Sequence, residues 1–210
     1  MKAEPLGDSA LILRDLDCPA YEVADAIQMA SLPGLLEAVA SYESVGLYFD
    51  PAVFAIETLW SLDFAGSKQQ HFVHTIPVCY ELGDDLQEVA TTLGLTADDV
   101  IGLHASTSYR CFAVGFCPGF AYLGYLPDKL VGIARRPTPR VRVPPGSVAI
   151  TGRQTGVYPL ERPGGWAIIG RTPFCLVDVE SAYFPIKAGD ELRFVPIKLN
   201  EFESLKGMRL

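Results

Sequence analysis

Hydrophobic and polar positions in the first seventy residues follow two different periods. Apolar residues recur at three- and four-residue intervals within residues 20–32, which predicts a helix there. Shorter apolar runs on either side are typical of strands, and they cover residues 9–14, 35–42 and 45–49. A second helix is expected after Asp50, which fits an N-cap, and Pro51, which fits the first helical position. The order strand–helix–strand–strand–helix predicts a small ferredoxin-like α+β domain over residues 1–70, ending in a linker at 66–70.

The remaining residues, 71–210, combine two helical stretches with many short strand-like runs. A strand over residues 72–80 contains Pro77, which favours the edge of a sheet. Two short helices follow, over residues 84–93 and 96–104. Between residues 115 and 173, 10 glycines and 9 prolines interrupt the chain. Such closely spaced breakers predict a closed or nearly closed β-barrel, with strands near residues 110–116, 140–143, 147–150, 166–169, 174–177 and 191–195.

Composition limits the class of protein. Hydrophobic residues make up 49% of the 210 residues and charged residues 20%, which excludes a disordered chain. No apolar run is long enough to span a bilayer, and residues 1–8 lack the pattern of a secretory signal. We therefore expect a cytoplasmic protein without a membrane partner. The net charge of −8 also makes non-specific binding of nucleic acid unlikely.

The charge is unevenly distributed. Residues 1–100 carry 17 acidic and 3 basic side chains, whereas residues 132–171 carry 1 acidic and 7 basic side chains. All seven basic residues are arginines, whose planar guanidinium suits paired contacts to carboxylate or phosphate: Arg135, Arg136, Arg140, Arg142, Arg153, Arg162 and Arg171. Two interpretations remain open. The arginines either form an anion site, or they solvate the surface and meet the acidic N-terminal half.

Three histidines are the main candidates for proton transfer or metal binding. His71 and His74 lie three apart in an expected strand, on opposite faces, so we expect no metal site. His104 ends an expected helix just before the barrel. A helix C-terminus stabilises a protonated imidazole, which would raise the histidine pKa. His104 is therefore either a capping residue or a site residue at the barrel mouth.

The densest sequence signal lies between residues 115 and 172. Glycines beside aromatic residues let the backbone approach a ligand, while aromatic side chains supply walls: Phe116, Phe120, Tyr122 and Trp166. Polar groups in the same stretch could contact a substrate: Arg140, Ser147, Gln154, Tyr158, Arg171 and Thr172. The alternative is that the glycines and prolines only turn the corners of a tight barrel.

These motifs resemble the family of the 5-oxoprolinase B subunit (PxpB), also called KipI or allophanate hydrolase subunit 1. The related half of the carboxyltransferase domain of urea carboxylase is similar too. The similarity runs over most of the chain and is strongest between Gly115 and Pro173. Earlier matching strings are Gly7-Asp-Ser-Ala10, Ile76-Pro-Val-Cys-Tyr80, Asp85-Leu-Gln-Glu-Val-Ala90 and Leu103-His104.

The resemblance implies a cyclophilin-like β-barrel over residues 71–210, preceded by the small α+β domain. It also implies one component of an ATP-dependent enzyme that opens 5-oxoproline to glutamate, with Mg²⁺ accompanying the nucleotide. The partners would be the C subunit of 5-oxoprolinase, a related barrel protein, and its A subunit. Two other branches of the family suggest an inhibitor of a sensor histidine kinase, or a component of urea and allophanate degradation.

Residue roles follow from this chemistry, which requires cationic groups for anionic oxygens and a proton carrier. We expect His104 and Arg140 to be catalytic, with Arg140 turned towards His104 and Gln154. The expected substrate-binding residues are Ser147, Gln154, Tyr158, Arg171 and Tyr122. No complete set of nucleophile, base and metal is visible, which favours a half-site completed by another protein of the complex.

Overall fold

The structure is a computed structural model that describes residues 1–64 and 70–210. These residues divide into two compact units, Met1–His71 and Phe72–Leu210, which we call the N-terminal and C-terminal units. The expected linker at residues 66–70 lies almost entirely outside the described residues. No helix in the described ranges is both long enough and apolar enough to cross a membrane.

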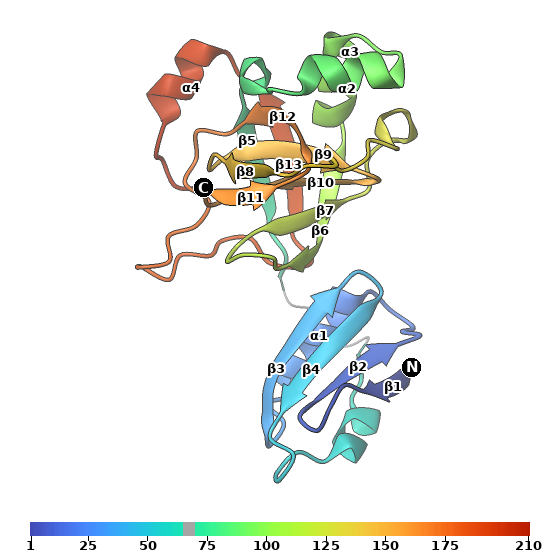
Figure 1. The fold of residues 1–210 in the computed structure, drawn as a ribbon. Coiled ribbons are helices and arrows are strands. Elements are labelled where there is room, and N and C mark those ends of the chain that lie inside the picture. Colours follow the sequence, from blue (N-terminus) through green and yellow to red (C-terminus); the bar gives the residue numbers. More distant parts are fainter. Residues whose placement is uncertain (65–69) are drawn as a thin grey trace. The chain divides into compact units, whose positions relative to one another are not determined.

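The N-terminal unit is an antiparallel sheet with one α-helix against one face (Figure 1). The strand order is β1-β2-β4-β3. Leu13 and Leu47 of the central strands and Ile27 of the helix are fully buried, and the helix contacts β3 and β4. The elements are β1 (Lys2–Pro5), β2 (Ala10–Arg14), α1 (Ala20–Met29), β3 (Leu35–Ser41), β4 (Ser44–Phe49) and the 3₁₀ helix η1 (Ile56–Ser61).

Two details of this unit differ from the expectation. Strand β1 is not among the expected elements, because its sequence carries charges and ends in a proline. The expected α-helix after Asp50 is wrong: a turn at residues 51–53 is followed by extended backbone at Ala55 and then by η1. Asp50 does accept a hydrogen bond from the Ala52 N–H, but Phe54 then stacks on Phe49 with ring centres 4.7 Å apart. This packing ends the helical turn.

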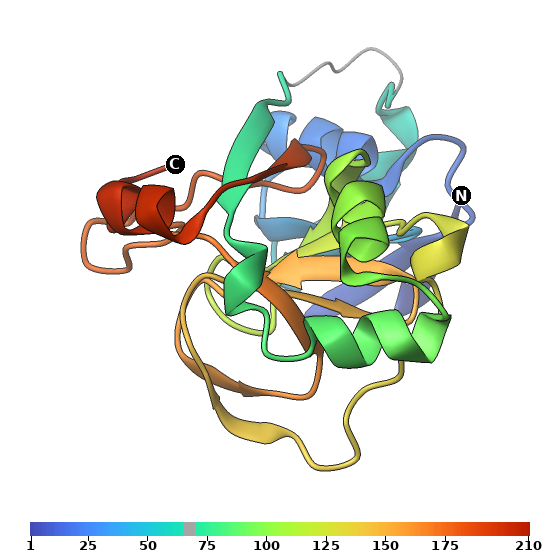
Figure 2. The same cartoon turned by 90° about the horizontal axis from the view of Figure 1, so that it is seen from above.

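The C-terminal unit is built on a seven-stranded sheet that curls into a nearly closed barrel (Figures 1 and 2). The strand order is β12-β9-β10-β7-β6-β13-β5, and a bridge between Cys79 and Arg171 links the two ends. Pro77 lies in the end strand β5, as predicted. The confirmed fold class is therefore mixed α+β with a barrel-like sheet.

The elements of this unit follow one another in short steps. The helical ones are η2 (Tyr80–Leu82), α2 (Leu86–Leu93), α3 (Ala97–Ala105), η3 (Asp128–Leu130) and α4 (Leu199–Leu205). The strands are β5 (Val73–Val78), β6 (Ser108–Val114), β7 (Ala121–Gly124), β8 (Arg140–Val143), β9 (Ser147–Thr151), β10 (Gln154–Val157), β11 (Arg162–Gly164), β12 (Ala167–Arg171) and β13 (Glu191–Pro196). Helix α2 contacts β12, and α3 contacts both α2 and β13.

Apolar residues pack on both faces of the barrel sheet. Ile150 and its neighbours fill the interior, whereas Ala149, one residue earlier on β9, faces outward. On this outer face a second cluster forms: Cys117, Phe120, Val143, Ala149, Tyr158, Trp166 and Ile168. One of its members, Val143, ends β8 of the two-stranded sheet, and another, Trp166, lies between β11 and β12. This second cluster forms the base of one of the clefts described next.

Candidate functional site

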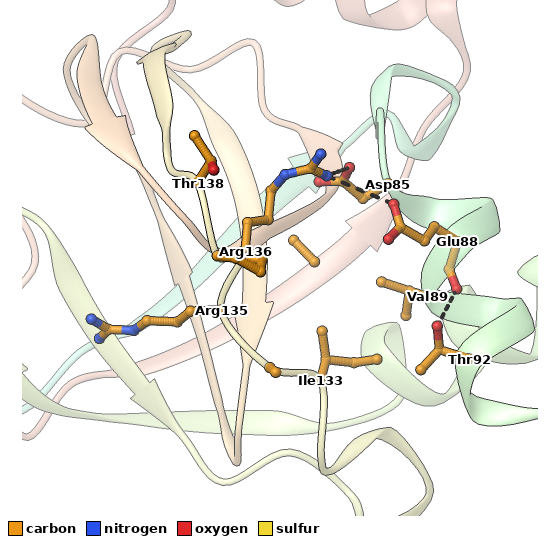
Figure 3. A pocket seen from close by; sticks show the side chains of 11 residues that line it. Asp85, Glu88, Val89, Thr92, Ile133, Arg135, Arg136 and Thr138 are labelled. Atoms are coloured by element: carbon orange, nitrogen blue, oxygen red, sulfur yellow. Dashed lines mark hydrogen bonds and ion pairs between the residues drawn. The ribbon is translucent and has the colours of Figure 1, made fainter.

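Two clefts flank the segment formed by residues 133–140. The Asp85 cleft has a volume of about 460 Å³ and is lined by α2 and this segment, including Asp85, Glu88, Thr92, Arg135, Arg136 and Thr138 (Figure 3). The aromatic cleft has a volume of about 260 Å³ and is lined by Phe116, Phe120, Tyr122, Arg135, Pro139, Tyr158, Pro163, Gly164, Gly165 and Trp166. Arg135 contributes to both.

Asp85 is the centre of an ion-pair network in the first cleft. The residue is only 4% exposed, and its Oδ1 accepts hydrogen bonds from Arg136 Nη1 at 2.9 Å and Arg140 Nη2 at 2.6 Å. Oδ2 accepts one from the Ile168 backbone N–H at 2.7 Å, and the Asp85 N–H donates to the Ile168 carbonyl at 2.8 Å. The carboxylate therefore ties the start of α2 to β12 and to residues 136–140.

Arg136 is also 3.7 Å from Glu88, so its charge is balanced by two carboxylates. Arg140 donates to Asp85 through Nη2. Its Nη1 is buried and has no hydrogen-bond partner among the described residues. Both guanidiniums are thus held at Asp85, and neither projects freely into the cleft.

The aromatic cleft is built around Phe120. Four aromatic side chains meet its ring edge-to-face, with ring centres 4.9–5.6 Å apart: Phe116, Tyr122, Tyr158 and Trp166. Gly164 lies directly on Tyr158, and a Cβ at position 164 would overlap the phenol oxygen. Burial raises the pKa of Tyr158, against smaller opposing effects of the Trp166 backbone and of Arg135 and Arg140. The phenol therefore stays protonated and can donate a hydrogen bond.

Arg135 supplies the positive charge of this cleft. Its guanidinium carbon lies 5.9 Å from the centre of the Trp166 ring, within range of a cation–π contact. In Figure 3 it points in the direction opposite to Arg136 and away from Asp85. Within residues 1–64 and 70–210, no carboxylate forms an ion pair with Arg135. The aromatic cleft thus carries a cation that lacks a counter-ion in the described part of the chain.

The structure brings together only some of the predicted site residues. Tyr122 and Tyr158 both line the aromatic cleft, and their assignment as substrate-binding residues stays a prediction. Ser147 is buried, and its hydroxyl donates to the Pro144 carbonyl at 2.8 Å. Arg171 donates through Nε to the Pro145 carbonyl at 3.0 Å. Gln154 lies on β10 opposite Gly124 and Thr151, and neither it, Ser147 nor Arg171 lines the two clefts.

His104 does not lie at a barrel mouth, so that expectation is wrong. It is fully buried, and burial lowers its pKa to about 3, the opposite of the expected effect of the helix terminus. Thr155 donates to the Ala149 carbonyl, so its hydroxyl accepts from His104 Nε2–H at 2.9 Å. Nδ1 then accepts from the Tyr80 hydroxyl at 2.7 Å. This neutral, fully bonded ring joins α3 to the barrel and has no contact with solvent.

Arg140 is placed differently as well. The expected break in strand alternation is present, since Val141 is 83% exposed while Val143 is fully buried. However, the side chain turns to Asp85, whereas His104 bonds to Tyr80 and Thr155. No hydrogen bond among the described residues joins Arg140 to His104 or Gln154. The buried carboxylate of Asp85 needs a cationic partner, and this requirement determines the direction of the Arg140 side chain.

Comparisons with known proteins agree with this architecture. The family described as "Carboxyltransferase domain, subdomain C and D" matches residues 1–185. The B subunit of 5-oxoprolinase from Bacillus subtilis (strain 168) is 32% identical, covering 97% of this chain and 95% of the relative. The protein of the same name from Escherichia coli O157:H7 is 38% identical, covering 92% and 94%. The chain therefore belongs to the carboxyltransferase-domain family that contains these 5-oxoprolinase B subunits.

Solved structures extend the comparison of the fold. PH0987 from Pyrococcus horikoshii is 36% identical with a TM-score of 0.59, covering 96% of this chain and 100% of that one. TTHA0988 is 36% identical with a TM-score of 0.79, but the 90% of this chain that aligns spans only 40% of the TTHA0988 chain. The urea amidolyase of Kluyveromyces lactis shares the fold, with 16% identity and a TM-score of 0.70. The aligned region covers 97% of this chain and 15% of the urea amidolyase chain.

Four charged residues of the two clefts were not predicted as site residues: Asp85, Glu88, Arg135 and Arg136. Asp85 is part of a matching motif, and the two arginines are part of the basic stretch, but nothing local connects them. The signal that could have paired them is the charge imbalance of residues 132–171, because seven arginines with one acidic residue need partners from elsewhere. For Arg136 and Arg140 the interpretation that the arginines meet the acidic N-terminal half is the correct one.

The residues of the two clefts do not fit a nucleoside triphosphate. The larger cleft contains Asp85 and Glu88, whose carboxylates face the arginine that a phosphate would need. The sequence has no glycine-rich phosphate loop, and the aromatic cleft is below the usual size of a cofactor site, about 300 Å³ or more. In the described ranges no three His, Cys, Asp or Glu side chains gather in a way that could hold a metal ion.

Proposed function

We propose that this chain is the B subunit of an ATP-dependent 5-oxoprolinase that opens 5-oxoproline to glutamate together with its A and C subunits. The observation that carries the proposal is the alignment with proteins named as the 5-oxoprolinase B subunit, two of them over more than nine-tenths of both chains. The urea-processing alternative rests on a structural neighbour at 16% identity, which supports only the fold. No feature of the clefts favours a kinase inhibitor.

In this proposal the chain is inactive alone and contributes substrate contacts to a site shared with its partners. His104 is fully buried and hydrogen-bonded through both ring nitrogens, and Asp85 is bound by two arginines. Neither group is free to act as a general base. The nucleotide and its Mg²⁺ are then bound by a partner protein of the complex, which acts in the cytoplasm.

The test is reconstitution. The chain is co-expressed with the A and C proteins, the complex is purified, and 5-oxoproline-dependent ATP hydrolysis and glutamate formation are measured together. We expect both activities only when all three proteins are present, and neither when this chain is omitted or assayed alone. Full activity without this chain, or no activity from an assembled complex, would contradict the proposal. Saturable inhibition of a histidine kinase by the chain in the same preparation would favour the alternative branch of the family.

A further inference from the structure

We propose that the aromatic cleft binds a small, flat, ring-bearing carboxylate, with Arg135 holding the carboxylate and the aromatic walls holding the ring. On the proposed function, on which this identification rests, the ligand is 5-oxoproline. Arg135 and Trp166 are thereby assigned as substrate-binding residues.

Arg135 differs in its charge partners from most arginines of residues 132–171. Five of the other six arginines of residues 132–171 are engaged by the protein: Arg136 and Arg140 by Asp85, Arg142 by Glu161, Arg162 and Arg171 by backbone carbonyls. The sixth, Arg153, stacks on Tyr125 outside both clefts. Arg135 has no such partner among the described residues and contacts only an aromatic face. A guanidinium binds a carboxylate through two parallel N–H···O bonds. Arg135 is therefore free to do so without breaking any described ion pair.

The shape of the aromatic cleft suits a small, flat ligand. Trp166, Tyr122 and Phe120 present ring faces and edges to a space of about 260 Å³. Ligand pockets typically occupy about 300–1,000 Å³, so this one suits a molecule well below drug size. A five-membered lactam offers flat faces to the aromatic rings and a carbonyl oxygen that the protonated Tyr158 phenol can meet as donor.

The backbone beside Arg135 is preorganised. The Arg136 N–H donates to the Gly165 carbonyl at 2.8 Å, and the Arg136 side chain is held by Asp85 on the opposite side of the segment. The backbone is thus fixed at the residue next to Arg135, whose side chain points away from Asp85 (Figure 3) and lies over the Trp166 ring in the aromatic cleft. Fixing a binding group before the ligand arrives lowers the entropic cost of binding.

The same reasoning excludes the larger cleft as the carboxylate site. Asp85 and Glu88 already lie within 3.7 Å of Arg136, and a ligand carboxylate there would face two like charges. Such a juxtaposition of like charges strongly disfavours binding. An anionic ligand is therefore expected to bind at Arg135 and not at Arg136.

Binding is tested first on the full chain. The sequence has two tryptophans, Trp60 and Trp166, so Trp60→Phe leaves Trp166 as the only indole reporter. Three probes are titrated: 5-oxoproline, 2-pyrrolidinone with the ring but no carboxylate, and acetate with a carboxylate but no ring. We expect saturable Trp166 fluorescence change with 5-oxoproline, and binding at least about tenfold weaker for each partial probe. Arg135→Ala should weaken 5-oxoproline binding about tenfold or more.

Arg153→Ala is the matched control, because Arg153 also stacks on an aromatic ring, that of Tyr125 at 4.9 Å, but outside both clefts. In the reconstituted complex, Arg135→Ala should raise KM for 5-oxoproline about tenfold while Arg153→Ala leaves it unchanged. Equal effects of the two variants, equal binding of 2-pyrrolidinone and 5-oxoproline, or an unchanged KM for Arg135→Ala would overturn the site.

The two proposals fail separately. A wild-type complex that does not turn over 5-oxoproline contradicts the proposed function, while Arg135-dependent binding of the carboxylate to the chain would still support the site. An active complex in which Arg135→Ala changes neither binding nor KM contradicts the site and leaves the proposed function intact.

Discussion

The two clefts on either side of residues 133–140 use neighbouring arginines in opposite ways. In the Asp85 cleft, Arg136 and Arg140 share one buried carboxylate that also holds the Ile168 N–H. In the aromatic cleft, Arg135 lies on Trp166 and has no carboxylate partner in the described residues. Removing one partner of a buried pair leaves an uncompensated charge, whereas an unpaired surface cation can accept a ligand at little structural cost. The difference separates arginines that hold the fold from one that is available for binding.

At neutral pH, the largest effect of a single substitution on stability is expected at Asp85. In Asp85→Asn, the amide nitrogen must face either an arginine or the Ile168 N–H. Two hydrogen-bond donors then point at each other, and a hydrogen bond is lost. We expect the free energy of unfolding to fall by about 2–4 kcal/mol in urea denaturation. The matched control is Glu88→Gln, since Glu88 is largely exposed and 3.7 Å from the same Arg136, with a change within about 0.5 kcal/mol. Similar losses for both variants would show that Asp85 is an ordinary surface partner.

A smaller effect is expected where β11 lies against the aromatic cleft. In Gly164→Ala the new methyl group overlaps Tyr158, whose ring has to move, and overpacking of this kind costs about 1–3 kcal/mol. Gly165→Ala is the control, because the nearest atom to its Cβ is 3.5 Å away. Unfolding curves and the Trp166 fluorescence of both variants measure the difference. A Gly164→Ala protein with unchanged stability and unchanged fluorescence would contradict this prediction, because it would show that the Tyr158 ring can move aside without cost.

His104 extends the comparison to a polar group that is fully satisfied inside the barrel. Its folded pKa is about 3 and the unfolded value is near 6.5, so between these values the unfolded chain binds the extra proton. The stability due to the neutral ring is present above about pH 6.5 and is lost as pH falls towards 3. Within this window we expect His104 to lower the free energy of unfolding by about 1.4 kcal/mol for each unit by which the pH falls.

Denaturation of wild type and His104→Gln at several pH values measures this slope. The variant has no imidazole to protonate, so the corresponding part of the pH dependence should disappear, whatever its own stability. Identical slopes in the two proteins would mean that His104 is accessible to protons in the folded chain, as a site histidine would be.

The smallest effect on stability is expected for Arg135→Ala. Its side chain is exposed and has no ion pair in the described ranges, so the free energy of unfolding should change by no more than about 0.5 kcal/mol. Thermal or urea unfolding of this variant beside Asp85→Asn makes the contrast between the two clefts quantitative. A loss comparable with that of Asp85→Asn would place Arg135 among the structural arginines.

Local sequence patterns predicted much of the fold because periodicity and breakers act over a few residues. The strands near residues 110–116, 147–150, 166–169 and 191–195, the helices near residues 86 and 97, and the end position of β5 with Pro77 are confirmed. Two barrel strands were predicted wrongly: residues 174–177 form no strand, and residues 140–143 pair with β11 in a separate two-stranded sheet. The site was harder to predict, because contacts over long sequence separations decide it. Arg140 turns to Asp85, 55 residues away, and His104 is buried against Thr155, 51 residues away. Tyr122 and Tyr158 line the aromatic cleft, where aromatic side chains beside glycines gave a local signal, and their role in binding substrate stays a prediction.

The claim that Arg135 meets the ligand and Arg136 does not is tested most directly by NMR. Arginine Nε–Hε signals of the ¹⁵N-labelled full chain are assigned with Arg135→Lys and Arg136→Lys and then followed during titration with 5-oxoproline. The signal of Arg135 should move in a saturable way, while the signals of Arg136 and Arg140 stay in place because Asp85 holds both side chains. A shift of Arg136 with Arg135 unmoved, or no shift of any arginine at saturating ligand, would contradict the account.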